Sequence, residues 1–263
     1  MAAGKTSKLS KAPKSKSDSS NRIRSAYAEL ERAHQDIKEA HMAIVLRLAI
    51  VAEYRDEDTG AHIMRISEYG SALAKEIGLS EAEIETFRFS SPLHDIGKIA
   101  IPDYILKKKG KLTEKEFEIM KDHTVIGARM FENSSSPILR AAADICRSHH
   151  EKWDGSGYPF GLKGEKIPLM ARITTLVDVF DALTSKRCYK EAWPFQMGVD
   201  YLKEGAGKQF EPRLVNAFVR IQPTIKKIYE ANLSLQKTIK ELNMPEIGNV
   251  KEKTEEEINE EEG

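Results

Sequence analysis

The sequence is poor in cysteine and in long apolar segments, and each scarcity excludes a class of protein. Its 263 residues include two cysteines, Cys146 and Cys188, which are too few for a disulfide framework and lack zinc-finger spacing. The longest apolar stretch, residues 41–52, is interrupted by Arg47 and is shorter than the ~20 residues that span a bilayer. The Lys- and Ser-rich N-terminus has no apolar segment of the secretory kind. We therefore expect a cytoplasmic protein without a membrane span.

The chain also lacks net charge, because 41 Lys and Arg balance 41 Asp and Glu. The balance arises because the N-terminus is basic and the C-terminus is acidic. Residues 1–24 carry seven basic residues and one Asp, whereas residues 251–263 carry seven Glu and two Lys. The remaining residues, 25–250, sum to −1. A body of that charge has no basic surplus with which to bind duplex nucleic acid.

Composition and periodicity predict an all-α fold between two tails. Residues 1–21 contain one leucine, no other branched aliphatic and no aromatic residue, so we expect a disordered basic tail, and we expect residues 245–263 to form an acidic tail. Residues 48–222 show helical periodicity without alternating strand patterns. Residues 223–244 predict a further helix that packs on the N-terminal one through aliphatic residues on one side. These are Ile228, Leu235, Ile239 and Leu242.

Residues 22–47 predict a coiled-coil signalling helix. Apolar and aromatic residues and two histidines follow one another at alternating spacings of 4 and 3, the heptad signature. This seam consists of Ile23, Tyr27, Leu30, His34, Ile37, His41, Ile44 and Leu48. His34 and His41 occupy equivalent seam positions, where they either set the register or sense pH or a metal, and the register role is the commoner one. The helix favours a parallel homodimer that relays a signal from an upstream sensor or receiver domain.

The body holds histidines in patterns that suggest chemistry. His94 and Asp95 are adjacent, and Lys98 follows one helical turn later. Surface His–Asp pairs are common, so this run is not decisive alone. Asp178 lies on a small-residue helix face beside an apolar stripe, either as a paired or metal-bound carboxylate or as a half-exposed acid at the helix edge. The other histidines of the body are His62, His123, His149 and His150.

Seven ordered motifs resemble those of the HD-GYP family. They are RDEDTGAH (55–62), SPLHDIGKIAIPD (91–103), KDHTVIG (121–127), SHHEKWDGSGYP (148–159), GEKIPLMARI (164–173), VDVFDALTSKRCYK (177–190) and GKQFEP (207–212). The resemblance covers roughly residues 45–220. It implies an HD-superfamily helical domain, here expected over residues 48–222 and preceded by the coiled-coil helix, that hydrolyses cyclic di-GMP.

The resemblance also implies roles for individual residues. The implied metal ligands are His62, His94, Asp95, His123, His149, His150 and Asp178. Asp95 and Lys98 are the implied catalytic residues, and Lys98, Arg187 and Lys190 are the implied contacts to substrate phosphate or guanine. Gly157, Tyr158 and Pro159 form the GYP loop. Diguanylate cyclases are candidate partners.

Elementary coordination chemistry agrees with these roles. Imidazole and carboxylate ligands without thiolate suit two or three divalent ions, with iron or manganese preferred and nickel possible. Asp95 would bridge two ions ~3.5–4 Å apart, so that a hydroxide between them attacks phosphorus in line and yields pGpG. One ion would be bound by His123, His149 and His150, and the other by His94 and Asp178. Lys98 would neutralise a nonbridging phosphate oxygen.

The sequence departs from the family pattern at three positions. Asp58 lies four residues before His62 and directly after Glu57. The related subgroup usually has a Glu at this position, which helps bind a third metal, and Asp is one methylene shorter. We expect Asp58 to bind a third ion with its shorter reach, or Glu57 to replace it if the loop register shifts. A third ion would extend hydrolysis from pGpG to GMP. Cys188 stands where Pro is usual, and Glu211 where Asp is usual.

Two alternatives to a cyclic di-GMP hydrolase remain open. The first is a hydrolase of the same fold that acts on 3′3′-cyclic GMP-AMP or another nucleotide. The second is an inactive receptor or scaffold that uses the GYP loop to bind signalling partners.

Overall fold

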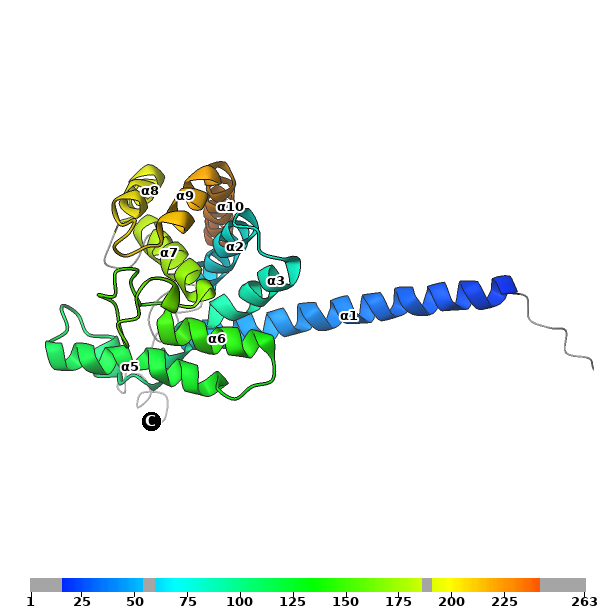
Figure 1. Ribbon diagram of the computed structural model, residues 1–263, viewed down its shortest axis with the longest axis horizontal. Coiled ribbons are helices and arrows are strands. Elements are labelled where there is room, and N and C mark those ends of the chain that lie inside the picture. Colours follow the sequence, from blue (N-terminus) through cyan, green and yellow to red (C-terminus); the bar gives the residue numbers. More distant parts are fainter. Residues whose placement is uncertain (1–15, 54–59, 186–190, 242–263) are drawn as a thin grey trace, which may run out of the picture. The chain divides into compact units, whose positions relative to one another are not determined.

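The computed structural model describes residues 16–53, 60–185 and 191–241, and these are helices and their connections. In order they are α1 (Lys16–Glu53), α2 (Gly60–Glu76), α3 (Glu81–Ser90), η2 (Ser91–Leu93), η3 (Ile96–Ala100), α4 (Asp103–Leu106), α5 (Glu114–Phe131), α6 (Pro137–Ser148), η4 (Gly164–Lys166), α7 (Leu169–Thr184), α8 (Phe195–Glu204), α9 (Pro212–Arg220) and α10 (Gln222–Glu241), where η denotes a 3-10 helix (Figure 1). Within those ranges no strand forms. The predicted all-α class is confirmed.

The chain divides into two compact units, residues 1–44 and 45–263. In the first unit α1 begins at Lys16, six residues before the predicted helix start, so residues 16–21 are helix rather than tail. Once a helix is nucleated, each added residue gains a backbone hydrogen bond at little cost. The predicted seam residues Ile23 and Leu30 are 57% and 65% exposed.

The main core of the second unit lies between α2, α7 and the C-terminal helices. On α2, Ile66, Tyr69 and Leu73 face one way and are fully buried. They pack against α7, where Phe180 meets the ring of Tyr69 edge-on with 5.6 Å between ring centroids. Figure 1 shows α2 and α7 side by side. This packing fixes the faces of both helices that carry candidate ligands.

The C-terminal helix contributes to this core. We expected residues 223–244 to pack on the N-terminal helix, but Ile225 is fully buried and Ile228 packs against the main core, where α10 contacts α2 and α9. The first turns of α10 therefore belong to the body. Leu235, Ile239 and Leu242 lie outside the residues whose side chains are described, so the predicted packing of that half stays a prediction.

Two helices begin where the sequence places capping boxes. Ser80 precedes α3 and Thr113 precedes α5, and in each case the carboxylate of the glutamate three residues later, Glu83 or Glu116, accepts a hydrogen bond from the backbone N–H of the cap. The cap at Thr113 sets the start of the helix that carries His123. Over the part of the chain that the structure describes, no helix is long and apolar enough to cross a membrane.

Candidate metal centre

Seven predicted ligands converge in the body as two groups. Within each group, every residue offers a ligand atom less than 4.8 Å from the others. The first group contains Asp95, His123, His149 and His150, and the second contains His62, His94 and Asp178. They come from α2, the turn between η2 and η3, α5, the end of α6 and α7. Residues up to 116 positions apart in the sequence are thus brought together by helix packing.

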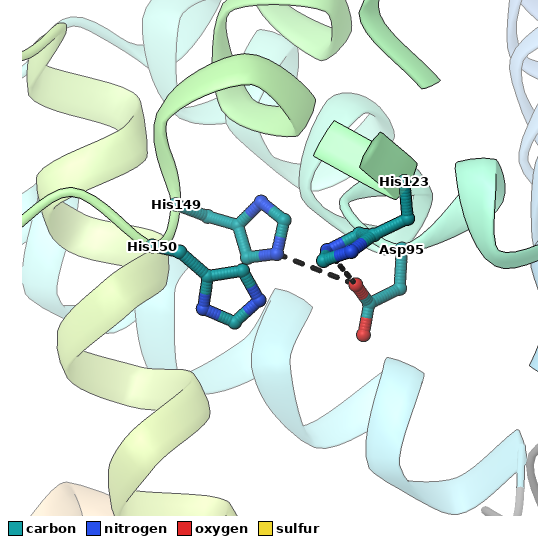
Figure 2. Close-up of side chains that lie close together, drawn as sticks. All are labelled: Asp95, His123, His149 and His150. Atoms are coloured by element: carbon teal, nitrogen blue, oxygen red, sulfur yellow. Dashed lines mark ion pairs between the residues drawn. The ribbon is translucent and has the colours of Figure 1, made fainter. Parts of the chain in front are cut away.

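Asp95 occupies the centre of the first group. Its Oδ1 lies 3.2 Å from Nε2 of His123 and 3.3 Å from Nε2 of His149, as Figure 2 shows. Its Oδ2 lies 3.4 Å from Nε2 of His94, a member of the second group, and 2.9 Å from Nζ of Lys98. One carboxylate therefore faces both groups, which is the arrangement expected of a ligand shared by two cations.

Backbone carbonyls fix the tautomers of three histidines. Nδ1 of His94 bonds the carbonyl of Ser91 at 3.0 Å, and Nδ1 of His123 bonds that of Met120 at 2.6 Å. Nδ1 of His149 bonds the carbonyl of Ile145 at 3.0 Å. A carbonyl only accepts, so Nδ1 carries the proton in each ring and a neutral ring presents a lone pair at Nε2. Three lone pairs thus face Asp95.

The buried atoms at this centre lack hydrogen-bond partners. Among the described residues, Oδ1 of Asp95 and Nε2 of His94, His123 and His149 are all buried without one. An unsatisfied buried polar group costs about 1–3 kcal/mol, and lone pairs of nitrogen and oxygen that face each other at 3.2 Å also repel. Cations between them would remove both costs. The donor set therefore fits divalent metal ions bound by imidazole and carboxylate.

The protonation states of the site residues also suit metal binding. Burial raises the pKa of Asp95, but Lys98, His94 and the neighbouring imidazoles outweigh it and hold that pKa well below its usual range. Burial lowers the pKa of His149, and burial together with His149 holds the pKa of His150 well below its usual range. The site therefore combines an ionised Asp95 with neutral His149 and His150, the forms that bind metal. Burial lowers the pKa of His94, but Asp95 outweighs it and raises that pKa, so a metal ion at this ring would displace a proton.

The second group is built between α2 and α7. Nε2 of His62 lies 3.5 Å from Oδ1 of Asp178, and the rings of His62 and His94 lie 5.7 Å apart between centroids. On its other side His62 bonds Asp181 through Nδ1 at 2.7 Å. Burial raises the pKa of Asp181, but Arg65 and His62 lower it to about 2. The sequence reasoning missed Asp181 and Arg65.

The predicted GYP loop packs against the first group. The ring of Tyr158 stacks on that of His150, with centroids 4.7 Å apart and planes 27° from parallel, and its backbone N–H donates to the carbonyl of His150 at 3.2 Å. The buried carboxylate of Glu151 accepts from the backbone N–H groups of Phe160 and Leu162 at 2.8 and 3.0 Å. Glu151, which the sequence reasoning also missed, thus closes the loop over the site.

Gly157 brings two backbone segments into contact, so we expect Gly157→Ala to destabilise the fold. A Cβ at this position would lie 2.3 Å from N of Lys152 and 2.5 Å from Cα of Glu151, and neither backbone atom can swing away. Overpacking of this kind costs about 1–3 kcal/mol, which chemical denaturation would measure. Ser156→Ala is the control, because Ser156 is exposed and the change adds no volume. Equal stability of both variants would contradict the predicted clash.

Four residues of interest cannot be placed. Asp58, Arg187, Cys188 and Lys190 lie outside the described residues. The predicted third-metal ligand and two of the predicted substrate contacts therefore rest on sequence alone. Lys98 is described, and its ammonium group reaches Asp95.

Comparison with known proteins assigns the family. The HD domain model matches residues 43–214. A cyclic di-GMP phosphodiesterase of Thermotoga maritima is 45% identical over 182 residues, which are 69% of this chain and 50% of that protein. A 3′3′-cGAMP-specific phosphodiesterase of Vibrio cholerae is 44% identical over 180 residues, 68% of this chain and 34% of that protein. The chain thus spans half the length, or less, of these relatives.

The fold agrees with the sequence comparison. The crystal structure of a cyclic GMP-AMP-specific phosphodiesterase of V. cholerae superimposes with a TM-score of 0.54 at 19% identity, covering 79% of this chain and 53% of that one. At that identity the likeness concerns the fold alone. The family match extends over most of the body and includes the adjacent His94 and Asp95, so this chain belongs to the HD-domain family.

Proposed function

We propose that this chain is a metal-dependent phosphodiesterase that hydrolyses cyclic di-GMP to pGpG. The observation that carries the proposal is the position of Asp95, whose two oxygens face separate groups of imidazole and carboxylate ligands. The similarity to the T. maritima cyclic di-GMP phosphodiesterase supports the substrate. The similarity to the V. cholerae 3′3′-cGAMP-specific enzyme supports cyclic GMP-AMP as the second candidate substrate.

Two divalent ions are the proposed cofactors, with iron or manganese favoured by the ligand types. His123, His149 and His150 would hold one ion, His62, His94 and Asp178 the other, and Asp95 both. Bound there, the ions supply Lewis acidity toward the phosphate and lower the pKa of the attacking water. A third ion near Asp58 is proposed from the sequence alone and would extend hydrolysis to GMP.

The chain's own residues supply charge and order around the substrate phosphate. Lys98 keeps 16% of its side chain exposed while its Nζ lies 2.9 Å from Asp95, so it is available to a phosphate at the centre. Arg187 and Lys190 are proposed to hold the phosphates or guanine bases. Tyr158 and Glu151 keep His150 and the loop in place, so the lone pairs are oriented before substrate binds.

Hydrolysis of a panel of cyclic dinucleotides tests the proposal. The protein is purified without oxygen, loaded with Fe²⁺ or Mn²⁺ under reducing conditions, and given cyclic di-GMP, 3′3′-cyclic GMP-AMP and cyclic di-AMP. We expect the fastest hydrolysis with cyclic di-GMP, and product identification distinguishes pGpG from GMP. Faster hydrolysis of cyclic GMP-AMP would favour the second candidate. Intact cyclic di-GMP with fully metal-loaded protein would overturn the proposal, and cyclic di-GMP binding without turnover would favour a receptor or scaffold.

We also propose that α1 forms a parallel coiled-coil homodimer that relays a signal from a sensor or receiver domain. Support comes from the heptad spacing and from the large apolar residues of this seam, which are 54–69% exposed in the single chain. They are Ile23, Tyr27, Leu30, Ile37, Ile44 and Leu48. A repeated exposed apolar row of this kind is expected to be covered by a partner.

We expect Leu30→Lys to dissociate the dimer, because it places a charge in each of two facing seam positions. Light scattering should give the wild type twice the 29.6 kDa of one chain and the variant a single-chain mass. Gln35→Lys, an exposed change one position beyond seam residue His34, is the matched control and should remain dimeric. A monomeric wild type at high concentration would contradict the coiled-coil proposal.

A further inference from the structure

A buried ion pair between α2 and α7 lies directly behind His62. Nε and Nη2 of Arg65 donate to the two carboxylate oxygens of Asp181 at 2.5 and 2.8 Å. His62, Arg65 and Asp181 are 3%, 5% and 1% exposed, so solvent does not weaken these contacts. Nη2 of Arg65 also donates to Oγ of Ser185 at 2.8 Å. Two donors on two oxygens leave Asp181 little freedom to rotate.

Asp181 in turn orients His62. Its Oδ2 lies 2.7 Å from Nδ1 of His62, and because an ionised carboxylate only accepts, Nδ1 must carry the proton. The opposite nitrogen, Nε2, then points its lone pair toward the second group, where Oδ1 of Asp178 lies 3.5 Å away. In His94, His123 and His149, backbone carbonyls accept from Nδ1 and orient the ring in the same way. Among these four histidines, His62 is the one oriented by a charged side chain.

The two helices present these residues as a matched pair of rows. His62 and Arg65 are three residues apart on α2, and Asp178 and Asp181 are three apart on α7, so each pair shares a helix face. His62 faces Asp178 in one row, and Arg65 faces Asp181 in the next. The contact between His62 and Asp181 joins the rows. Displacement of Asp181 would therefore be transmitted to the ring of His62.

Stability alone does not explain this pair. Buried ion pairs are weak stabilisers, since apolar side chains of similar volume often serve as well or better. An apolar pair, however, could not accept the Nδ1 proton of His62. In metal sites, a carboxylate that accepts from a ligating histidine fixes the ring, and its loss typically costs 10–100-fold in metal affinity.

We propose that Asp181 is the positioning residue of the second ligand group and that Arg65 holds it in place. Asp181 keeps Nε2 of His62 directed at the ion shared with His94 and Asp178. Arg65 is itself anchored to Ser185, the residue that follows α7. The inference rests on the proposed function in one respect, namely that the second group binds a metal ion.

Metal binding to the whole chain, without substrate, tests the inference. We expect wild-type protein to bind two Mn²⁺ per chain as a coupled pair in electron paramagnetic resonance. In Asp181→Asn one of the two acceptor oxygens becomes an amide N–H₂, which faces an N–H donor of Arg65 or His62, so affinity at the second group should fall about 10–100-fold. At limiting Mn²⁺ its spectrum should change to the six-line signal of an isolated ion. Wild-type affinity and coupling in this variant would overturn the proposal.

Two further variants separate positioning from stability. Asp181→Leu combined with Arg65→Leu leaves no unpaired buried charge, so it should fold while losing the second ion. Glu211→Gln is the matched control, because buried Glu211 pairs with Arg172 in a contact that includes no proposed ligand, and it should keep both ions. If the double leucine variant also kept both ions, the pair would be structural only. Wild-type protein that binds two ions but hydrolyses no cyclic dinucleotide would overturn the proposed function and leave this inference standing.

Discussion

Asp95→Asn is expected to remove both paired metal binding and hydrolysis. The two oxygens of Asp95 face His123 and His149 on one side and His94 on the other, so this side chain is positioned to serve both ligand groups. Asparagine has the same shape but no charge, and one of its two terminal atoms becomes an amide nitrogen that cannot bind a cation. Turnover should fall by at least the roughly 10²–10³-fold that follows loss of one preorganised electrostatic contact.

Metal analysis and hydrolysis on the same preparations measure this effect. The paired control is Asp144→Asn, since Asp144 is an exposed acid on α6 that lies 3.9 Å from Arg147, and it should behave as wild type. An Asp95→Asn protein that retained two coupled ions would show that Asp95 does not bridge. A protein with one ion and residual activity would mean that a single ion suffices for the chemistry.

The fold was predictable where local signals decide it. The helical periodicity of residues 48–222, within which α2 and α7 form, lies in the sequence itself. One helix boundary and one packing contact were not predictable in this way. The start of α1 at Lys16 depends on propagation of a helix nucleated further along the chain, and the place of Ile225 in the main core depends on tertiary packing against α2. Composition and period do not encode either effect.

The ligands of the site were predictable, but the residues that hold those ligands in place were not. His94 and Asp95 stand together in the sequence, and the motifs supplied the remaining ligands. Asp181 had one local signal, its position three residues after Asp178, but its partner Arg65 lies 116 residues away. Glu151 follows His150 directly, yet its role depends on how the loop returns to offer its backbone N–H groups. Residues that orient ligands thus depend on long-range contacts that single-sequence patterns do not reveal.

Lys98→Met is expected to separate catalysis from metal binding. Methionine keeps most of the length and apolar character of the lysine stem but removes the charge. If Lys98 neutralises a phosphate oxygen as charge develops, kcat should fall roughly 10²–10³-fold, while KM changes less and both ions remain bound. Steady-state kinetics with cyclic di-GMP, together with metal analysis, would measure both effects.

The contact between Lys98 and Asp95 offers a competing explanation, and the same variant distinguishes the two. Nζ of Lys98 lies 2.9 Å from Oδ2 of Asp95 and is the main charge that lowers the pKa of that carboxyl against the effect of burial. If this contact were its whole role, Lys98→Met would lose metal affinity in step with activity, and saturating metal would restore turnover. If Lys98 acts on the phosphate, saturating metal leaves the loss in kcat unchanged. Lys98→Arg, which keeps the charge in a larger, planar group, should then recover part of the activity without changing metal content.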